Sequence, residues 1–266
     1  MRTFLEEILE LKRTRVEAAK KSSEILNLKS QIRAAREKAR GAHRLREALQ
    51  NQSRLNVIAE IKRASPSKGV INEQIDVAES ARNYERGGAC AISVLTEEDK
   101  FRGSLEDLKT ARAGVCLPLL RKDFIFDEFQ IYEAADAGAD VILLIVAMLD
   151  DETLARLRRL TEDELKMDAL VEVHTLEELR RAKKIGSTLI GVNNRDLHSF
   201  KVSLDVSREL IKHAPAGALM IAESGLQTRA DLLELKDLGF QGFLIGEALM
   251  RSGNVETELK NLVELK

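Results

Sequence analysis

The spacing of apolar residues along the chain changes at about residue 56. Beyond it, short apolar runs alternate with longer stretches in which apolar residues recur every three or four positions. Strands that alternate with helices indicate a parallel sheet, because parallel neighbours need a crossover connection. The runs predict eight strands, at 57–62, 91–96, 117–122, 140–146, 169–174, 188–193, 219–223 and 242–246.

A repeat of about 50 residues favours closure of this sheet into a barrel. Gly88, Gly138, Gly186 and Gly239 each lie where a helix should end before a strand, 50, 48 and 53 residues apart. Glycine is favoured just after a helix because that position takes a left-handed conformation. Two βα units per repeat give a (β/α)₈ barrel, the α/β fold that we expect. An open doubly wound sheet is the alternative, but no G-x-G-x-x-G follows an early strand.

Residues 1–50 follow a different pattern and predict a helical extension packed on the barrel of residues 51–266, in one overall domain. Leu5, Leu9, Val16 and Ala19 lie near one helical face, which Lys12 interrupts. A second stripe predicts a second helix, with the Ser22-Ser23 pair as its N-cap, and a short helix should follow near 44–49. The second stripe consists of Ile25, Leu28, Ile32, Ala35 and Ala39. A partner-binding coiled coil is the alternative interpretation of this extension.

Composition narrows the function classes. The net charge is −2 and aromatic residues make up 4% of the chain, which argues against nucleic-acid and membrane-surface binding. There is no signal-like N-terminus, and no apolar run approaches the roughly 20 residues of a membrane span, so we expect a soluble, cytoplasmic protein. Cys90 and Cys116 both follow or precede apolar runs and are expected to be buried, inert thiols. The scattered histidines suggest no metal site.

Charged residues end alternate predicted strands. Lys62, Lys122, Glu172 and Glu223 lie 60, 50 and 51 residues apart, and Glu60 shares a strand face with Lys62. In a barrel, alternate strands fill one interior layer, and active sites lie at the carboxyl ends of the strands. Buried charges are costly unless paired, so a ring of lysines and carboxylates indicates acid–base chemistry rather than stability. A structural ion-pair network is the alternative.

Glycine turns after the last two predicted strands point to an anionic substrate. Ser224-Gly225 follows the seventh strand, and Gly246-Glu247 follows the eighth and enters a helix. Loops at these places commonly bind phosphate through backbone N–H groups. The loop of residues 63–69 adds hydroxyl and cationic donors. Arg195, just after Asn193 at the end of the sixth strand, could bind a carboxylate as a bidentate fork.

These residues resemble a known family. The segment Ile-Ala-Glu-Ile-Lys-Arg-Ala-Ser-Pro-Ser-Lys-Gly at 58–69 closely resembles the signature of the indole-3-glycerol phosphate synthases of tryptophan biosynthesis. Further blocks match in order, at 93–97, 120–125, 130–134, 170–174, 190–197 and 222–225. The resemblance covers about residues 57–250, and a helical arm before the barrel also fits the family.

The resemblance implies a carboxy-lyase that closes the indole ring of 1-(2-carboxyphenylamino)-1-deoxyribulose 5-phosphate, releases CO₂ and water, and uses no cofactor. It implies Lys122 as the general acid and Glu172 as the general base, with Lys62 and Glu60 acting on the substrate carboxylate or a later proton. We expect neighbouring groups to depress the pKa of Lys122 toward neutrality, which would suit an acid.

The remaining implied residues position or bind the substrate. Asn193 and Glu223 would orient hydroxyls and the lysines, Arg195 would face the anthranilate carboxylate, and Phe101 and Phe124 are candidates for the wall around the ring. The implied phosphate site consists of Ser65, Ser224, Gly225, Gly246 and Glu247.

Two other functions stay open at this point: another phosphate-binding barrel enzyme, such as a phosphoribosylanthranilate isomerase, and a non-catalytic barrel scaffold. The only partner that the sequence implies is a small phosphorylated substrate. A monomer fits the sequence, and association with another enzyme of the same pathway is not excluded.

Overall fold

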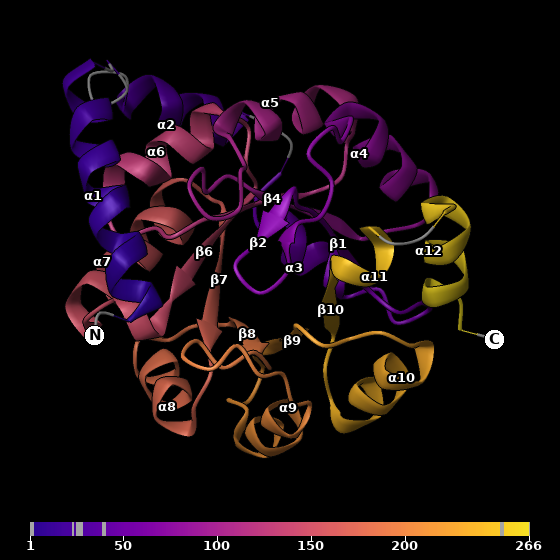
Figure 1. Cartoon of the computed structure of the whole chain (residues 1–266). Coiled ribbons are helices and arrows are strands. Elements are labelled where there is room, and N and C mark those ends of the chain that lie inside the picture. The colour runs from indigo at the N-terminus through magenta and orange to yellow at the C-terminus, as the bar shows by residue number, and fades with distance from the viewer. Residues whose placement is uncertain (1–2, 23, 25–28, 39–40, 251–252, 266) are drawn as a thin grey trace.

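A computed structural model describes residues 3–22, 24, 29–38, 41–250 and 253–265. Eight strands form a barrel, two short strands form a hairpin beside it, and helices surround both (Figure 1). The strands are β1 (Val57–Ile61), β2 (Ala64–Ser65), β3 (Gly69–Val70), β4 (Ala91–Leu95), β5 (Leu119–Lys122), β6 (Val141–Ile145), β7 (Asp168–Val173), β8 (Leu189–Asn193), β9 (Leu219–Glu223) and β10 (Gly242–Ile245). The helices are α1 (Phe4–Ser22), α2 (Lys29–Lys38), α3 (Arg44–Leu49), α4 (Val77–Arg86), α5 (Leu105–Gly114), α6 (Glu128–Asp136), α7 (Asp151–Arg159), α8 (Leu176–Lys184), α9 (Asp205–Leu210), α10 (Arg229–Leu238), α11 (Glu247–Met250) and α12 (Val255–Val263), with short helical turns η1 (Val146–Met148), η2 (Leu160–Glu164) and η3 (Ile211–His213).

The barrel is parallel and closed, which confirms the predicted (β/α)₈ fold and excludes the open sheet. Strand order is β1-β10-β9-β8-β7-β6-β5-β4, and the first strand pairs with the last in the register Val57↔Phe243. The two halves of the chain meet again where β6 pairs with β7. All eight predicted strands lie within one or two residues of the observed ones. The prediction did not include the hairpin β2–β3, which follows β1 directly.

Alternation along the strands separates two buried layers, because successive side chains point to opposite faces of a sheet. Four apolar residues of the inner layer each lie two positions before a charged residue at a strand end, so each pair shares a face. The pairs are Ile58 and Glu60, Leu120 and Lys122, Leu170 and Glu172, and Ile221 and Glu223. The intervening residues, such as Ala59, Val171 and Ala222, belong to the layer packed against the helices. The barrel interior is therefore apolar along the strands and charged at their carboxyl ends.

Local signals fix the helix ends around this barrel. Seven helices begin at a side chain that accepts a backbone N–H of the first turn, at Asp76, Ser104, Asp127, Asp150, Thr175, Thr228 and Asn254. The four repeat glycines Gly88, Gly138, Gly186 and Gly239 all have positive φ, as predicted from their place after a helix.

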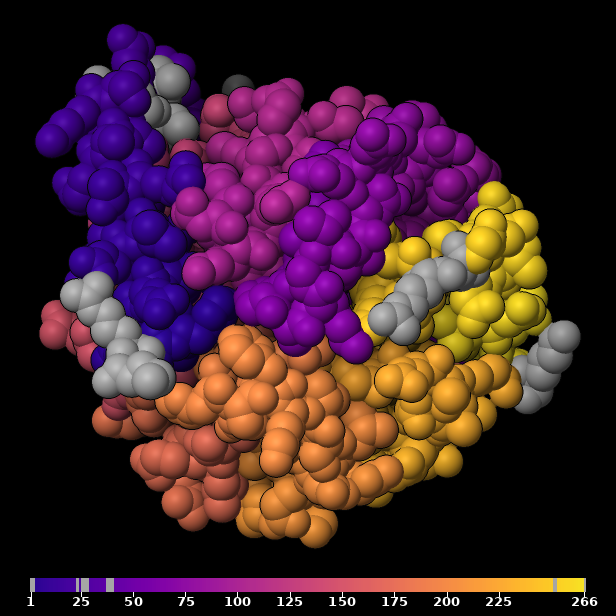
Figure 2. Space-filling model, in the orientation of Figure 1, coloured from indigo at the N-terminus to yellow at the C-terminus, as the bar shows by residue number. Residues whose placement is uncertain are grey.

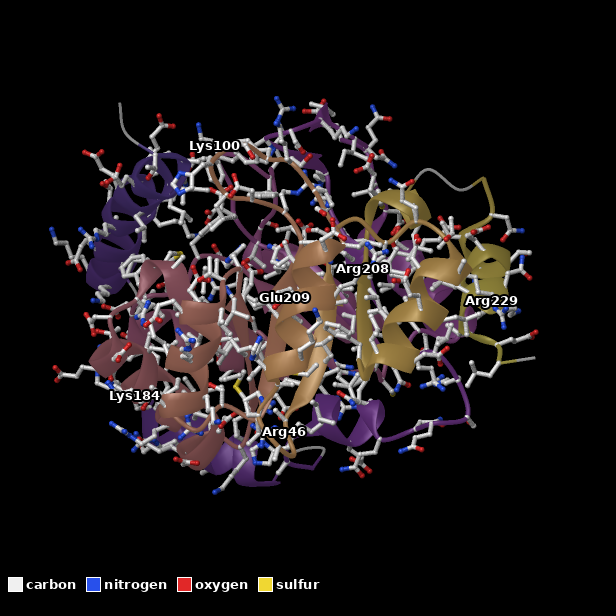
Figure 3. All side chains as sticks on the ribbon, turned by 90° about the horizontal axis from the view of Figure 1, so that it is seen from below. Arg46, Lys100, Lys184, Arg208, Glu209 and Arg229 are labelled. Carbon is white, nitrogen blue, oxygen red and sulfur yellow. The ribbon has the colours of Figure 1, made fainter. Side chains whose placement is uncertain are left out.

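The N-terminal extension packs on the barrel with one residue of its helical stripe unexpectedly buried. Helix α1 runs beside α6 at the left of Figure 1, and Ile8 shares the buried cluster of the barrel interior. Lys12, which interrupts the apolar stripe in the sequence, is 2% exposed. The lysine that interrupts the stripe is thus buried and not exposed to solvent. Leu45 and Leu49 of α3 join the same interior cluster, and Arg46 on that helix marks the end of the barrel opposite to Lys100 (Figure 3).

One expectation for this region was wrong. Ser22 is the last residue of α1, where its hydroxyl bonds back to the Ala18 carbonyl, so it does not cap α2. Ser23, Ile25, Leu28 and Ala39 of the predicted second helix lie outside the described residues.

Only one of the two cysteines is buried. Cys90 is buried, and burial raises the pKa of its thiol to about 12, whereas Cys116 is exposed. The prediction was wrong for Cys116 because this residue lies at the surface between α5 and β5. Its backbone N–H donates there to the Glu85 carboxylate. Within the described part of the chain, no helix is long and apolar enough to cross a membrane.

Candidate active site

One pocket opens at the carboxyl ends of the barrel strands, and it collects the predicted site residues. Its lining includes Glu60, Lys62, Phe101, Lys122, Phe124, Glu172, Asn193, Arg195, Glu223, Ser224, Gly225, Gly246 and Glu247. Ser65 alone among the predicted residues does not line it. The violet segment after β1 and the orange segment after β8 meet over the middle of this face (Figure 2), where the Arg195 guanidinium donates to the Ser67 hydroxyl at 3.3 Å.

Lys122 occupies the centre of the charged layer. Its Nζ lies 3.2 Å from Glu172 Oε2 and 3.4 Å from Glu223 Oε2, on two other strands. Burial disfavours the ammonium, but the carboxylates of Glu172, Glu223 and Glu60 outweigh burial and raise the pKa of Lys122 above its ordinary value. The expected depression of this pKa was therefore wrong. Lys122 is therefore protonated at neutral pH.

Glu172 and Glu223 both lie near Lys122 but differ in charge. Burial raises the pKa of Glu223 to about 8, helped by the neighbouring Glu172 and only partly opposed by Lys122. Burial acts on Glu172 in the same direction, but Lys122, His174 and a hydrogen bond from Asn193 together lower the pKa of Glu172. At neutral pH the site thus holds an ionised Glu172 beside a protonated Glu223, two carboxyl groups suited to different tasks.

A second lysine–carboxylate pair lies beside this group. Lys62 Nζ is 2.6 Å from Glu60 Oε1, as their shared strand face predicted. Glycines make the room for the carboxylates: a Cβ on Gly246 would lie 2.6 Å from Glu60 Oε1, and one on Gly191 would overlap the Glu223 carboxylate. The barrel wall therefore lacks side chains where the site needs space for charge.

Behind Lys122, a buried ion network reaches helix α1. The Asp123 carboxylate accepts from Lys12 Nζ and Arg121 Nη2, and from the Thr96 hydroxyl at 2.7 Å. Burial alone would raise the pKa of Asp123, but Lys12 and Arg121 lower it to about 2. Arg121 itself points away from the pocket, toward Glu133 of α6 at 2.8 Å. The residue after Lys122 is thus held by a cation from the N-terminal extension.

Aromatic side chains form an apolar wall opposite the charges. Phe4 of α1 lines the pocket with its ring centroid 5.3 Å from that of Phe200 and 6.2 Å from that of Phe124. Phe101 lies 6.3 Å from Phe124 and completes the wall. A flat aromatic ring bound here would find edge and face contacts on three sides.

The loops after β9 and β10 also line the pocket. Ser224 and Gly225 both have positive φ, so the chain turns sharply there, and Gly246 leads directly into α11. Ser67 lines this region where Ser65 was expected, because Ser65 belongs to β2 and pairs with Gly69 across the hairpin. The intervening turn brings Ser67 over the pocket.

Four contributors to the pocket or its support were missed from the sequence: Phe4, Ser67, Phe200 and Lys12. Lys12 alone carried a usable signal, because a lysine within an apolar stripe implies a buried partner. Phe4 and Phe200 reach the pocket from the extension and from the loop after β8, and no periodicity in either segment predicts that contact.

The described residues include one group of three clustered acidic side chains, Glu97, Glu98 and Asp99. All three are already engaged: Glu97 accepts three backbone N–H groups, Glu98 pairs with Lys12 and Asp99 pairs with Arg15. The cluster closes the loop after β4 and gives no reason to infer a metal.

The closed barrel, the lysines and carboxylates at alternate strand ends and the aromatic wall define a barrel enzyme with acid–base chemistry. The chain belongs to the indole-3-glycerol phosphate synthase family, whose model matches residues 5–262. It is 47% identical over 260 residues to the indole-3-glycerol phosphate synthase of Carboxydothermus hydrogenoformans (94% of this chain, 95% of the relative) and 46% identical over 253 residues to that of Chloroherpeton thalassium (94% and 95%). The Dehalococcoides mccartyi enzyme is 50% identical over 212 residues, covering 79% and 82%.

Among solved structures, a thiamine phosphate pyrophosphorylase from Pyrococcus furiosus matches with a TM-score of 0.58 and 20% identity, over 78% of this chain and 93% of that one. At that identity the likeness supports the barrel fold alone. The family assignment confirms the resemblance at 58–69 and decides against the isomerase and scaffold alternatives. The chain is a decarboxylating lyase of tryptophan biosynthesis that acts on a small phosphorylated substrate.

Proposed function

We propose that Lys122 is the general acid and Glu172 the general base in the conversion of 1-(2-carboxyphenylamino)-1-deoxyribulose 5-phosphate to indole-3-glycerol phosphate. One observation carries this proposal: the Lys122 ammonium is held between Glu172 and Glu223 on the pocket floor, 3.2 and 3.4 Å away. A fixed cation there can stabilise the negative charge that develops on a ketone oxygen under attack.

The proton balance uses both lysines and one carboxylate. The aromatic carbon that bears the carboxylate attacks the ketone carbon while Lys122 gives a proton to the ketone oxygen. The carboxylate leaves as CO₂ and its bonding electrons restore the ring. The new hydroxyl takes a second proton, from Lys62, and leaves as water. Glu172 removes one proton from the adjacent CH₂ to complete the indole. Two protons enter and one leaves, which matches the loss of one negative charge as CO₂.

The raised pKa of Lys122 fits this role once the substrate is bound. A lysine whose proton is stabilised by Glu172 and the neighbouring carboxyl groups acts first as a hydrogen-bond donor to the ketone oxygen. Transfer follows as the oxygen becomes strongly basic during ring closure. Glu223, protonated at neutral pH, contributes a hydrogen-bond donor and adds no second negative charge.

The pocket's shape supports an orientation for the substrate. The anthranilate ring lies against Phe4, Phe101, Phe124 and Phe200, and its carboxylate faces Arg195. The phosphate lies against Ser224, Gly225, Gly246 and Glu247. Ser67, which is hydrogen-bonded to Arg195, lies where a hydroxyl donor was expected from Ser65. Asn193 orients Glu172, consistent with their hydrogen bond.

The test is indole fluorescence after mixing the purified chain with the substrate, in buffer without added metal or cofactor. Wild type should give a rising signal. Lys122→Met and Glu172→Gln should fold, bind substrate and lose at least about a hundredfold in kcat, since one positioned acid or base contributes about 10²–10⁴-fold. Lys184→Met, on the exposed face of α8, is the control and should keep full turnover. Retained turnover in Lys122→Met would remove it as the acid.

A further inference from the structure

His174 lies directly after β7 and connects the proposed base to the surface of the barrel. Its Nε2 is 3.4 Å from Glu172 Oε1, and its Nδ1 is 3.2 Å from Glu178 Oε2 on helix α8. The His174 side chain is 10% exposed, that of Glu172 2% and that of Glu178 16%. The three side chains form a row from the pocket floor to the rim of the barrel. His174 has no part in the proton balance described above.

Glu178 holds the imidazole in one orientation. The same carboxylate oxygen that faces Nδ1 also accepts the backbone N–H of His174 at 2.7 Å. The Glu178 N–H in turn bonds to the hydroxyl of Thr175, the N-cap of α8. A carboxylate on Nδ1 favours a proton on that nitrogen and fixes the orientation of the ring. Nε2 is buried without a hydrogen bond among the described residues, and the carboxylate that lies near it is that of Glu172.

The charges around His174 are unequal on its two sides. Glu172 and Glu223 share the single ammonium of Lys122, which lies at similar distances from both. His174 adds a second cation that lies within 3.4 Å of Glu172, while Glu223 Oε1 has no hydrogen bond within the described structure. Two carboxylates beside one lysine cannot both stay ionised cheaply, so a third charged group decides which one does.

We propose that His174, held by Glu178, is a positioning residue that keeps Glu172 as the ionised member of the Glu172–Glu223 pair and so assigns the two carboxyl groups their roles. The inference rests on the proposed function, in which Glu172 is the base. An imidazolium with Nε2–H directed at Glu172 Oε1 stabilises that carboxylate and leaves Glu172 Oε2 free to face Lys122 and the substrate.

The direction of the proton equilibria agrees with the geometry. Burial lowers the pKa of His174, but the bond to Glu178 and the charges of Glu172, Glu178 and Glu223 outweigh burial and raise it. These carboxylates, from β7, α8 and β9, and the Lys122 ammonium behind Glu172 are the charged groups that face or border the ring. The raised pKa extends to higher pH the range in which His174 is charged and can stabilise an ionised Glu172.

The main test is the pH dependence of kcat in His174→Gln. Removing the imidazolium should move the acid limb of the profile upward by about one to three pH units, because an adjacent opposite charge shifts a carboxyl pKa by that much. At pH 6 kcat should fall at least about tenfold, whereas at high pH it should approach wild type and KM should stay within about twofold. Glu178→Gln keeps His174 and should move the limb in the same direction by less.

His213→Gln is the matched control, because His213 also pairs with a carboxylate four residues away, at 3.6 Å, on the exposed end of α9. Its profile should match that of wild type. An unshifted acid limb in both His174→Gln and Glu178→Gln, with normal folding, would overturn the proposal. Loss of activity at every pH with unchanged shape would also overturn it, since that is the result of a purely structural role.

A second measurement does not depend on turnover. The chain has 4 histidines, so their imidazole signals can be followed separately by NMR on isotope-labelled protein. The His174 signal, identified by its absence in His174→Gln, should titrate above the ordinary imidazole pKa of 6.5. Glu172→Gln should lower its midpoint. If Glu172→Gln stays active, the proposed function fails; if it is inactive but leaves the His174 midpoint unchanged, only the present inference fails.

Discussion

The Lys12 ammonium of helix α1 lies 2.9 Å from the carboxylate of Asp123, the residue that directly follows Lys122. Both side chains are almost fully buried, at 3% and 0% exposure. A helix outside the barrel therefore fixes the backbone beside the proposed general acid.

Replacing Lys12 by methionine should cost stability and activity together. The change leaves a buried carboxylate with Arg121 as its remaining cation, and breaking a buried pair costs about 3–5 kcal/mol. Urea unfolding measures this loss, and steady-state kinetics should find kcat reduced more than KM is raised, because Lys122 loses its support. Lys20, on the same helix as Lys12, forms a partly exposed ion pair with Asp127. Lys20→Met should therefore cost no more than about 1 kcal/mol of stability. Equal losses of unfolding free energy in the two variants would contradict the difference in burial between the two ion pairs.

The same network predicts a loss of stability in acid. The pKa of Asp123 is about 2 in the folded chain against an ordinary 3.8, so its ionised form stabilises the fold above pH 3.8. That contribution should disappear as the pH falls from 3.8 toward 2. Unfolding free energies of wild type and Asp123→Asn, measured over this range, should converge at the acid end. Parallel curves would remove Asp123 as the source.

Glu223 predicts the opposite dependence near neutrality. Its folded pKa of about 8 exceeds the ordinary 4.5, so the folded chain binds a proton that the unfolded chain has lost. Stability should therefore fall as the pH rises from 4.5 through 8, by at most about 1.4 kcal/mol per pH unit. Glu223→Gln stays neutral and should flatten the curve in this window. A variant curve with the wild-type slope would assign the proton elsewhere.

Gly191→Ala should damage the site rather than the fold. The new Cβ would overlap the Glu223 carboxylate, which would have to leave Lys122. We expect kcat to fall at least about tenfold, as small displacements of catalytic groups do, with a stability loss of about 1–3 kcal/mol from overpacking. Gly114→Ala, at the end of α5 with no neighbour closer than 3.7 Å, is the control and should behave as wild type.

Phe4→Ala should weaken substrate binding from outside the barrel. The ring contacts Phe200 and Phe124 across the pocket, and an aromatic contact pair contributes about 0.5–1.5 kcal/mol beyond its buried area. KM should rise several-fold with a smaller change in kcat. Leu11→Ala, 41% exposed on the same helix, should leave both constants unchanged. An unaltered KM in Phe4→Ala would separate helix α1 from the substrate pocket.

The sequence predicted the barrel and its charged layer well because both depend on local alternation. A residue two positions after an inner-layer leucine or isoleucine must lie on the same face, so Lys122, Glu172 and Glu223 could be placed without coordinates. The contacts that these side chains make between strands could not be predicted from the sequence. The carboxylates around Lys122 come from three other strands, and their combined effect reverses the expected direction of its pKa.

The pocket residues that the sequence did not predict depend on the path of the chain between elements. The turn of the β2–β3 hairpin brings Ser67, not Ser65, to the pocket. Phe4 and Phe200 are more than a hundred residues apart in sequence and meet through the docking of α1. Neither the turn nor the docking of α1 produces a periodic pattern in the sequence.

The order of the strands divides the chemistry between the two halves of the chain. Lys62 and Lys122 belong to the half built from β1, β4, β5 and β6, and Glu172 and Glu223 to the half built from β7, β8, β9 and β10. In the proposed mechanism, the first half provides both proton donors and the second half the proton acceptor, and the two halves pair along β6–β7 and β1–β10. Two separately made halves would be chemically complementary and individually inert, so turnover in a mixture of such fragments would report the closing of the barrel itself.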